Sequence, residues 1–517
     1  MRKFITIPGF KGGQADSLYE GLEKQTFQTI RNLNVNRGNI LSPLPAFVDI
    51  TAPVGTGTNN FAPLNCIKGS DGLYYFVGNQ TETSVRVRLY STGSLIAAPT
   101  WTQRDTVTTT DALSSAMEEY KDGIFWGYGT TLKRWGDISG TPASTTISAG
   151  LTTGINFLRE NKGLGVIFFV HDTGRLIGKY DNSTVTLAAL TLNKDERAVG
   201  IEPWGRFNII GIRQVAKQDK FYIWDGSATT VDDVIPTGDM GLQAFRLIGS
   251  VIHYIVARDV VQGDRFFRYY TLSIGGQPKL IKEFRVSTVT GTVDVEVQAM
   301  DTIGDTFQFA FGGDTYGLLD QVIWAYGSQN KDFPKMLWPY RTVLSGATTD
   351  IAFLSIKNFN DRFVVIYTDN ALTRPYKIEA VGPSSTLSDD GIYESEAFPL
   401  NGGLPGQIMR IYMNHTPNPA GAGFTVSVKL IGNYPWDGTI PAEDTFTDLT
   451  TDRGSGGATG ITQSTDNATF TEIASPANLE PARYAQIRVE LDEISTTNGA
   501  EIIWPIILEI ETELNRP

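Results

Sequence analysis

The sequence predicts an all-β protein: a β-propeller with an irregular N-terminal arm before it and a β-sandwich after it. Three observations support this. At seven places a small or polar turn residue is followed by a short run of aliphatic and aromatic residues. A second, aromatic-rich run follows each of these, so that strands repeat in pairs. Turn formers, threonine and aromatic residues abound, whereas helical periodicity is rare.

The turn residues recur at intervals close to the length of one propeller blade. The intervals are 51, 40, 42, 45, 55 and 56 residues, and a four-stranded blade takes about 40–50. The turn residues are Gly72, Gly123, Gly163, Gly205, Ser250, Asp305 and Asp361. We expect about seven blades in residues 61–383. Six blades, or eight if residues 1–60 supply one, are the alternatives.

Within each repeat, the run after the turn is expected to be the inner strand, because its small and β-branched residues suit the narrow axis. The aromatic-rich second runs would be outer strands that fill the widening wedge. These second runs span residues 85–90, 131–135, 175–180, 220–224, 265–272, 321–326 and 374–378. Residues 17–25 and 111–120 alone could hold a few helical turns. Residues 330–340 indicate an exposed, aromatic-rich loop.

Residues 1–60 contain several turn signals and little periodicity, which indicates an ordered but irregular arm. In closed propellers a terminal strand often completes the last blade, because this removes two exposed strand edges. A strand within residues 28–35 or 46–50 could play this role.

Residues 384–517 begin with a linker and then show strands that alternate apolar and polar residues. We expect residues 406–416 to pair with 424–436, and 483–493 to pair with 501–514; the segment has the size of one β-sandwich. From Ser385 onward there are 19 acidic and six basic residues, a net charge of −13 that equals the charge of the whole chain. The sandwich therefore lacks the basic patch that binds phosphate backbones or anionic lipids.

No residue pattern indicates an enzyme or a cofactor. A single cysteine, Cys66, excludes internal disulfides and cysteine-rich metal sites. The three histidines lack metal-ligand spacing, and no nucleophile elbow or nucleotide-binding loop occurs. Glu118 with Glu119, Asp219 and Asp301 are candidates for paired axial carboxylates of a sugar-cleaving propeller. Acidic residues are common in turns, however, so we predict a protein that is not an enzyme.

Two groups of residues are candidate binding sites. Carboxylates of Asp389, Asp390 and Glu394 could offer oxygens to Ca²⁺, although we favour a solvated linker. Four aromatic residues expected to be exposed could stack on sugar rings or seal an interface with another subunit, and we favour the interface. These aromatic residues are Trp338, Tyr340, Tyr434 and Trp436.

The N-terminal arm carries Gly-Gly-Gln-Ala-Asp-Ser at residues 12–17, Tyr-Glu-Gly at 19–21, and a polar segment that ends in Leu-Pro. This resembles the opening of propeller-containing virion proteins of tailed bacteriophages, of the tail-nozzle or tail-hub type. Residues 483–511 are similar to the closing strands of sandwich modules appended to such proteins. The resemblance implies a virion structural protein, most simply a tail ring subunit on the DNA ejection path.

Such a subunit would form a homo-oligomeric ring that contacts the tail adaptor and fibres. It would be assembled in the host cytoplasm, in keeping with one reduced cysteine and with the lack of a secretory signal or an apolar run of about 18 residues. DNA would pass without specific binding, because an uncharged or acidic lining offers phosphates no attraction. The alternatives are a glycan-binding receptor module of the tail and a polysaccharide-cleaving propeller enzyme.

Overall fold

In the computed structural model, the regular secondary structure of the described residues consists of strands β1 to β42. None of these residues belongs to a helix long and apolar enough to cross a membrane. The described residues are 2–7, 13–14, 26–34, 40–53, 61–81, 85–109, 111, 113–259, 264–287, 299–304, 306–311, 322–327, 335–343, 351–360, 362–369, 376–382, 391–415, 422–431, 446–448, 461–462, 470–474, 482–493 and 501–512.

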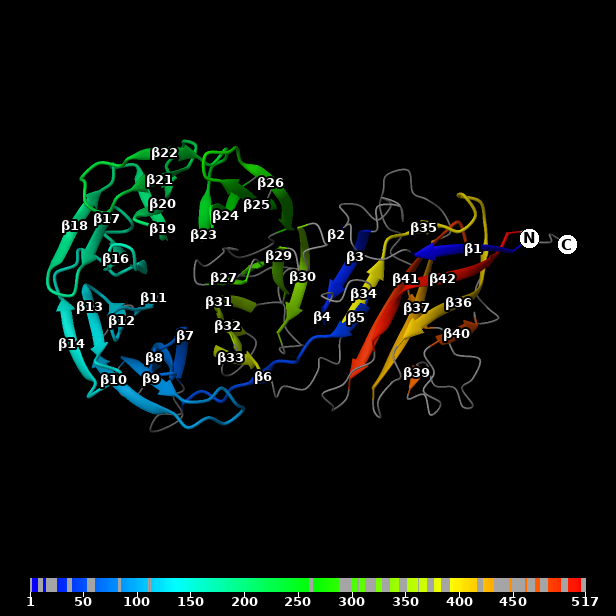
Figure 1. The fold of residues 1–517 in the computed structure, drawn as a ribbon, viewed down its shortest axis with the longest axis horizontal. Coiled ribbons are helices and arrows are strands. Elements are labelled where there is room, and N and C mark those ends of the chain that lie inside the picture. Colours follow the sequence, from blue (N-terminus) through cyan, green and yellow to red (C-terminus); the bar gives the residue numbers. More distant parts are fainter. Residues whose placement is uncertain are drawn as a thin grey trace. The chain divides into compact units, whose positions relative to one another are not determined.

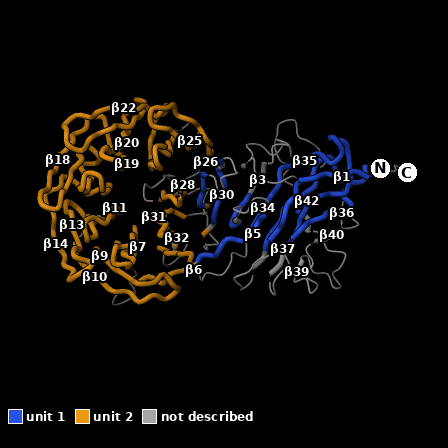
Figure 2. The backbone as a smooth tube through the Cα atoms, in the orientation of Figure 1, with its two compact units in different colours: residues 1–47, 323–342, 383–517 blue, residues 48–322, 343–382 orange. Residues whose placement is uncertain are grey.

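The chain divides into two compact units (Figure 2). Unit 1 comprises Met1–Phe47, Ile323–Thr342 and Pro383–Pro517, and unit 2 comprises Val48–Val322 and Val343–Gly382. The expected boundaries, 1–60, 61–383 and 384–517, differ from these units in two places. Residues 1–47 group with the C-terminal segment because their strands pair with its strands, and residues 323–342 also group with it.

The chain forms seven four-stranded sheets in sequence order, and the pairs with described register are antiparallel. The first sheet, in the order β10-β9-β8-β7, comprises β7 (Phe61–Lys68), β8 (Tyr74–Thr81), β9 (Val85–Thr92) and β10 (Thr102–Thr108). The second comprises β11 (Leu113–Glu119), β12 (Gly123–Tyr128), β13 (Thr131–Gly136) and β14 (Ala143–Ser148). The third comprises β15 (Phe157–Asn161), β16 (Val166–His171), β17 (Leu176–Tyr180) and β18 (Val185–Thr191).

The remaining four sheets follow the same order of strands. The fourth comprises β19 (Glu196–Trp204), β20 (Phe207–Gln214), β21 (Lys220–Trp224) and β22 (Asp233–Pro236). The fifth comprises β23 (Leu242–Ile248), β24 (Val251–Asp259), β25 (Asp264–Ser273) and β26 (Lys279–Ser287). The sixth comprises β27 (Met300–Ile303), β28 (Thr306–Ala310), β29 (Val322–Gly327) and β30 (Met336–Thr342). The seventh, in the order β31-β32-β33-β6, comprises β31 (Ile351–Phe359), β32 (Arg362–Asp369), β33 (Tyr376–Val381) and β6 (Val48–Asp49).

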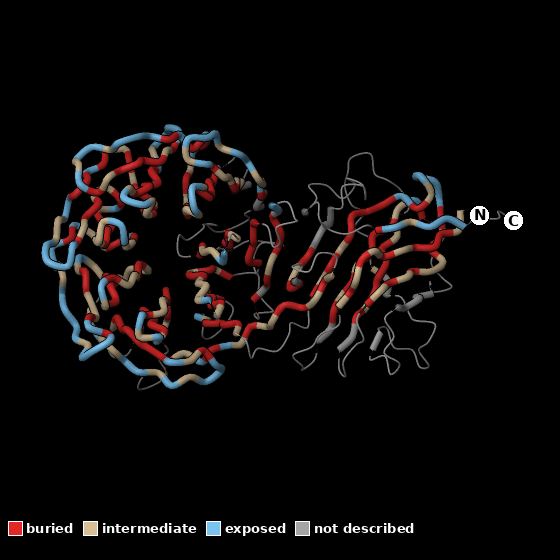
Figure 3. Tube along the Cα trace, in the orientation of Figure 1, coloured by how far each residue is buried: buried red, intermediate tan, exposed pale blue. Residues whose placement is uncertain are grey.

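The first strands of these sheets contact one another in a closed cycle that runs β7, β11, β15, β19, β23, β27, β31 and back to β7. Figure 1 shows labelled first strands at the inside of unit 2 and fourth strands such as β14 and β22 at its outside. Exposed residues are frequent on outer strands such as β14 and β22 (Figure 3). Four-stranded sheets repeated radially around an axis form a β-propeller, so the prediction of an all-β protein that contains a propeller is confirmed.

The predicted position of the inner strand was wrong by one strand. The apolar runs that follow the turns are the second strands, such as β8, β12 and β16. These strands are buried on both faces and therefore read as continuous apolar runs; four residues of β12 from Ile124 to Gly127 are all buried. The inner strands precede the turns and carry charged residues. Residues 113–119 form β11 because pairing with β12 overrides their helical propensity.

Strand β6 closes the propeller. Val48 pairs with Ala380 and Asp49 with Glu379 of β33, and the Ile50 N–H donates a 2.8 Å hydrogen bond to the Ile378 carbonyl. This pairing shields the edge of β33 that would otherwise be exposed. Of the two expected closing segments, residues 46–50 contain β6. The other contains part of β3 (Thr26–Arg31), which pairs with a strand of unit 1.

Unit 1 contains two larger sheets. The six-stranded sheet comprises β1 (Arg2–Ile7), β4 (Leu33–Asn34), β5 (Ile40–Pro43), β36 (Gln407–His415), β40 (Phe470–Ala474) and β42 (Ile502–Glu511). The eight-stranded sheet comprises β2 (Gly13–Gln14), β3, β34 (Gly391–Ser395), β35 (Phe398–Pro399), β37 (Ala422–Ile431), β38 (Phe446–Asp448), β39 (Ile461–Thr462) and β41 (Tyr484–Glu493).

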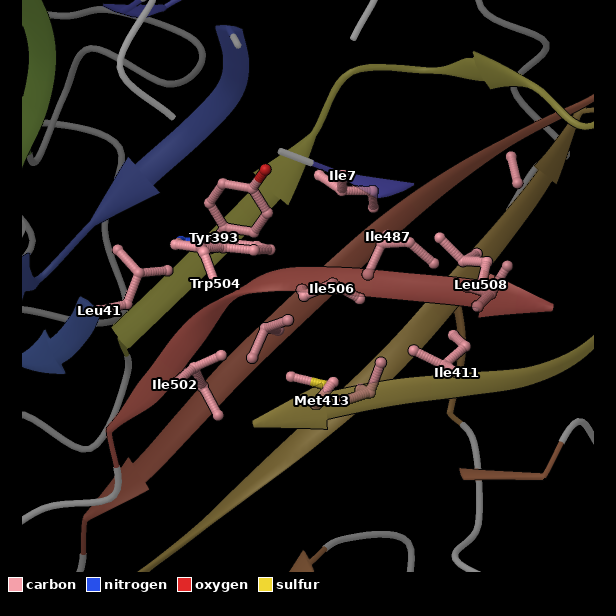
Figure 4. Close-up of a cluster of buried hydrophobic side chains, with 14 of the residues drawn as sticks. Ile7, Leu41, Tyr393, Ile411, Met413, Ile487, Ile502, Trp504, Ile506 and Leu508 are labelled. Carbon is pink, nitrogen blue, oxygen red and sulfur yellow. The ribbon is translucent and has the colours of Figure 1, made fainter. Parts of the chain in front are cut away.

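The predicted pairing of the C-terminal strands was wrong. Strand β36 pairs with β42, and β37 pairs with β41, so consecutive strands lie in different sheets. Figure 4 shows the apolar core of this unit, with Met413 of β36, Ile487 of β41 and Leu508 of β42. Consecutive amphipathic strands can alternate between two sheets when their apolar faces meet in one core, and alternation along a strand does not reveal which strand it pairs with.

Candidate functional site: a charged belt at the propeller axis

Six of the inner strands carry a charged residue at equivalent positions, just before the turn that leads to the second strand. Each of these residues pairs in register with a residue of the second strand of its own sheet. We call the six residues the axial belt. They are Glu118 on β11, Arg159 on β15, Glu202 on β19, Arg246 on β23, Asp301 on β27 and Lys357 on β31. In sequence order their charges alternate, so the belt is neutral as a whole.

Neighbouring belt residues form ion pairs from one sheet to the next. Arg159 Nη1 lies 3.6 Å from Oε2 of Glu118, and Arg159 Nη2 lies 2.8 Å from Oε2 of Glu202. Arg159 Nε also donates to Glu202 Oε2 at 3.1 Å, which makes this contact a fork. On the other side of Glu202, Arg246 Nη1 lies 2.6 Å from Oε1. The second, third, fourth and fifth sheets are therefore linked by an unbroken series of ion pairs.

The belt continues to the sixth and seventh sheets through backbone groups. Arg246 Nη2 donates a 3.2 Å hydrogen bond to the carbonyl of Met300, the residue before Asp301. The Asp301 carboxylate accepts a 2.7 Å hydrogen bond from the backbone N–H of Asn358, the residue after Lys357. The Asn358 side chain in turn donates to Gln308 on β28 at 2.9 Å.

The pKa values of Glu202 and Arg159 are shifted in the direction expected for mutual pairing, and that of Lys357 in the opposite direction. Burial by itself would raise the pKa of Glu202, but the guanidinium groups of Arg159 and Arg246 lower it overall. Burial opposes the charge of Arg159, yet the carboxylates of Glu202 and Glu118 raise its pKa. The pKa of Lys357 is lowered, first by burial and then by Arg246, while Asp301 acts in the opposite direction.

This arrangement suits a clamp better than a catalytic centre. A glycosidase needs one carboxyl group that keeps a proton and a second that is free to attack or to activate water. Here Glu202 is held ionised between two arginines, and Glu118 and Asp301 each have a partner. Ion pairs that cross between sheets instead tie consecutive inner strands together.

The four carboxylates considered from the sequence have different surroundings. Glu118 and Asp301 belong to the belt. Glu119 accepts a 3.0 Å hydrogen bond from the backbone N–H of Ser70. Asp219 is fully buried and accepts backbone N–H groups of Gln214 and Leu242, which is a structural role.

The predicted aromatic site is contradicted where the structure describes it. Residues 336–342 form strand β30, and Trp338 is 1% exposed within the core of unit 1. Tyr340 is partly buried and makes an edge contact with Trp338 at 6.3 Å between ring centroids. Trp338 therefore has no face to offer to a sugar ring. Residues 337–339 and 341 are buried, so a strand within the core, rather than an exposed loop, explains this aromatic-rich segment. Tyr434 and Trp436 lie outside the described residues.

The predicted calcium site can be followed for one of its three residues. Glu394, on β34, forms an ion pair with Arg488 at 2.6 Å, which occupies its carboxylate. Asp389 and Asp390 lie outside the described residues. Within the described part of the chain, no group of three or more acidic, histidine or cysteine side chains is placed to hold a metal ion.

Sequence reasoning did not find Arg159, Glu202, Arg246 and Lys357. A signal for them does exist. In the second to seventh repeats, the residue three to five positions before the turn alternates in charge from one repeat to the next. Aligning the repeats by their turns, instead of by their apolar runs, would have revealed the belt.

The fold is assigned from the sheet topology and not from comparisons with known proteins. No protein-family model matches the chain, and no curated protein matches it. Among solved structures, the WD40 domain of Pan2 from Neurospora crassa is 10% identical, with a TM-score of 0.39, and covers 65% of this chain and 99% of its own. The β-propeller domain of Cps50 (Swd1) from Myceliophteria thermophila is 9% identical, with a TM-score of 0.40, and covers 63% and 100%. YCF48 from Cyanidioschyzon merolae is 12% identical, with a TM-score of 0.40, and covers 65% and 99%.

Proposed function

We propose that this protein is a structural subunit of a bacteriophage virion, of the kind that forms a ring in the tail, and that it is not an enzyme. The axial belt is the observation that supports the proposal that the protein is not an enzyme. The axis is where propeller enzymes that cleave sugars place their carboxylates, and here Glu118, Glu202 and Asp301 are all engaged by partners from adjacent sheets. The proposal of a virion role depends on the resemblance of residues 12–21 and 483–511 to virion proteins of tailed bacteriophages.

The detailed architecture belongs to the same proposal. We infer that the seven four-stranded sheets are the blades of a seven-bladed propeller, because their inner strands contact one another in a closed cycle. We infer that unit 1 is a β-sandwich, because its core draws Ile411 and Leu508 from one sheet and Val426 and Val489 from the other. A sandwich needs two sheets whose apolar faces share one core.

The belt also bears on the path of DNA. Glu202 and Arg246 expose only 5% and 4% of their side chains, so this part of the belt is shielded from solvent. We therefore place any passage for DNA in the middle of a ring of several subunits, and not along the axis of one propeller. The net charge of −13 in residues 385–517 fits a surface that DNA passes without adhering to it.

The test is the oligomeric state of the full chain at micromolar concentration, measured by mass photometry and by electron microscopy of negatively stained particles. A closed homo-oligomeric ring supports the proposal. A monomer that degrades host polysaccharide, and loses this activity in an axial Glu118→Gln variant, would overturn it. A trimer would instead favour a fibre or receptor-binding protein.

A further inference from the structure

One of the seven inner strands has no charged residue at the belt position. On β7 of the first sheet this position is Ile67, which pairs with Tyr75 as Glu118 pairs with Phe125. We propose that Asn65, two residues earlier on β7, closes the ring in place of an ion pair, and that the junction of the first and seventh sheets is where the propeller opens first.

A ring of alternating charges can close without conflict only if the number of positions is even. Seven sheets give seven positions. In the ring, the first sheet lies between the seventh sheet, which carries Lys357, and the second sheet, which carries Glu118. An acidic residue at the vacant position would face Glu118, and a basic residue would face Lys357, so either charge would meet one of its own sign. A neutral residue at this position avoids that repulsion.

Asn65 is placed to join both neighbours. Its Nδ2 donates a 2.7 Å hydrogen bond to the carbonyl of Ser115 on β11, in the second sheet. Its Oδ1 accepts a 2.8 Å hydrogen bond from the hydroxyl of Ser355 on β31, in the seventh sheet. The same oxygen accepts the backbone N–H of Cys66 at 2.8 Å. An amide has both donors and an acceptor, so one side chain can serve both sides of the gap.

The local backbone positions this side chain. The register between β7 and β8 shifts between Pro63 and Asn65, and the register between β31 and β32 shifts between Phe353 and Ser355. Irregularities of this kind turn the following side chain out of the regular alternation. Asn65 and Ser355 each come directly after such a shift, and both are fully buried. The hydrogen bond between them is therefore built into two inner strands and shielded from water.

The first sheet is consequently held differently from its counterparts. At the junction of the third and fourth sheets, Arg159 and Glu202 form a forked ion pair, and hydrogen bonds between charged groups are about twice as strong as neutral ones. At its junction with the seventh sheet, the first sheet has the neutral hydrogen bond between Asn65 and Ser355 in the place of the belt. At its junction with the second sheet, by contrast, Lys133 and Asp105 form a largely buried ion pair at 2.6 Å. The strand that completes the seventh sheet, β6, pairs through two residues only. These differences point to the junction of the first and seventh sheets as the opening point.

Hydrogen exchange of the full chain, followed by mass spectrometry in mild denaturant, tests this proposal. We expect amides of the first sheet to exchange roughly tenfold or more faster than those of the third and fourth sheets, through an opening that leaves the latter folded. The Asn65→Ala variant should raise exchange in the first and seventh sheets by a further ten- to hundredfold, roughly, because the hydrogen bonds of Asn65 to both neighbouring sheets are lost. Ser355→Ala removes only the hydrogen bond between Ser355 and Asn65, and it is the alternative variant if Asn65→Ala does not fold.

Asn208→Ala is the matched control. Asn208 is equally buried and links the third and fourth sheets through a 2.8 Å hydrogen bond from Asn161. This variant should leave exchange in the first sheet unchanged. Uniform exchange in all seven sheets, or fastest opening at the junction of the third and fourth sheets in the unsubstituted protein, would refute the proposal. Neither result bears on the oligomeric state, so this test and that of the virion role can fail separately.

Discussion

Arg246 and Glu202 form a buried ion pair between two inner strands of the propeller, with 2.6 Å between Nη1 and Oε1 and at most 5% of either side chain exposed. Arg159 approaches the same carboxylate from the opposite side. Glu202 thus pairs with two cations, one from each neighbouring sheet.

We expect Glu202→Gln to destabilise the propeller by about 3–5 kcal/mol, because it removes the counter-charge of the buried Arg246 guanidinium and one counter-charge of the partly buried Arg159 guanidinium. The measurement is the urea midpoint of unfolding. Glu283→Gln is the control, because Glu283 pairs with Arg268 at 2.6 Å on an exposed strand, and such a pair is worth about 0–1 kcal/mol. Equal losses in the two variants would contradict a special role for the belt.

The contribution of Glu202 should depend on pH in acid. Its pKa in the folded protein is below the ordinary value of 4.5, because of Arg159 and Arg246. The stabilisation is therefore complete above pH 4.5 and is lost as the pH falls through the lower, folded pKa. We expect the gap in urea midpoint between the unsubstituted protein and Glu202→Gln to narrow below pH 4.5 and to stay constant between pH 6 and 8. A gap independent of pH down to 2 would contradict this.

Tyr393→Phe should leave unit 1 as stable as before, or more stable. The hydroxyl of Tyr393 is buried beside Trp504 and has no hydrogen-bond partner among the described residues, so its removal relieves a desolvation cost. Tyr367→Phe is the control, since the hydroxyl of Tyr367 donates to Glu379. That variant should lose about 1–3 kcal/mol in thermal or urea unfolding. An equal loss for Tyr393→Phe would show that its hydroxyl has a partner after all.

Gly241→Ala should be among the most damaging small substitutions in the propeller. Gly241 has a φ of +87°, and an added Cβ would lie 1.9 Å from the carbonyl oxygen of Ala257. The backbone must move, so we expect a loss of more than 3 kcal/mol, roughly. Gly275→Ala has a similar φ of +84° but no atom near its Cβ, and should cost about 1 kcal/mol. Thermal unfolding of the two variants separates steric clash from backbone strain.

The repeat could be read from the sequence because the second strands are buried on both faces. Phe125 and Ile209 stand in continuous apolar runs for that reason, and such runs are visible without knowledge of the fold. The inner strands were misplaced because their belt residues are charged. Arg246 and Glu202 appear in the sequence as surface residues, since the partner that allows their burial lies 44 residues away.

The prediction for Trp338 failed in the opposite direction, because this residue was expected to be exposed and is buried. Trp338 stands in an aromatic-rich segment next to prolines and lysines, which is also how an exposed binding loop reads. Its burial depends on contacts with strands such as β3, about 300 residues earlier in the chain. Composition reports which side chains could be buried, whereas long-range pairing decides which of them are.

The pairing of β1 with β42 sets the order of events during synthesis. Arg2 and Glu509 are 507 positions apart, yet their side chains are in contact. Ribosomes add about 5–20 residues per second, so β42 emerges roughly 25–100 s after β1. Throughout that interval β1 has no partner strand, while the propeller acquires all of its strands once residue 381 has been made. A nascent chain should thus contain a finished propeller while its N-terminal strand is still exposed to chaperones.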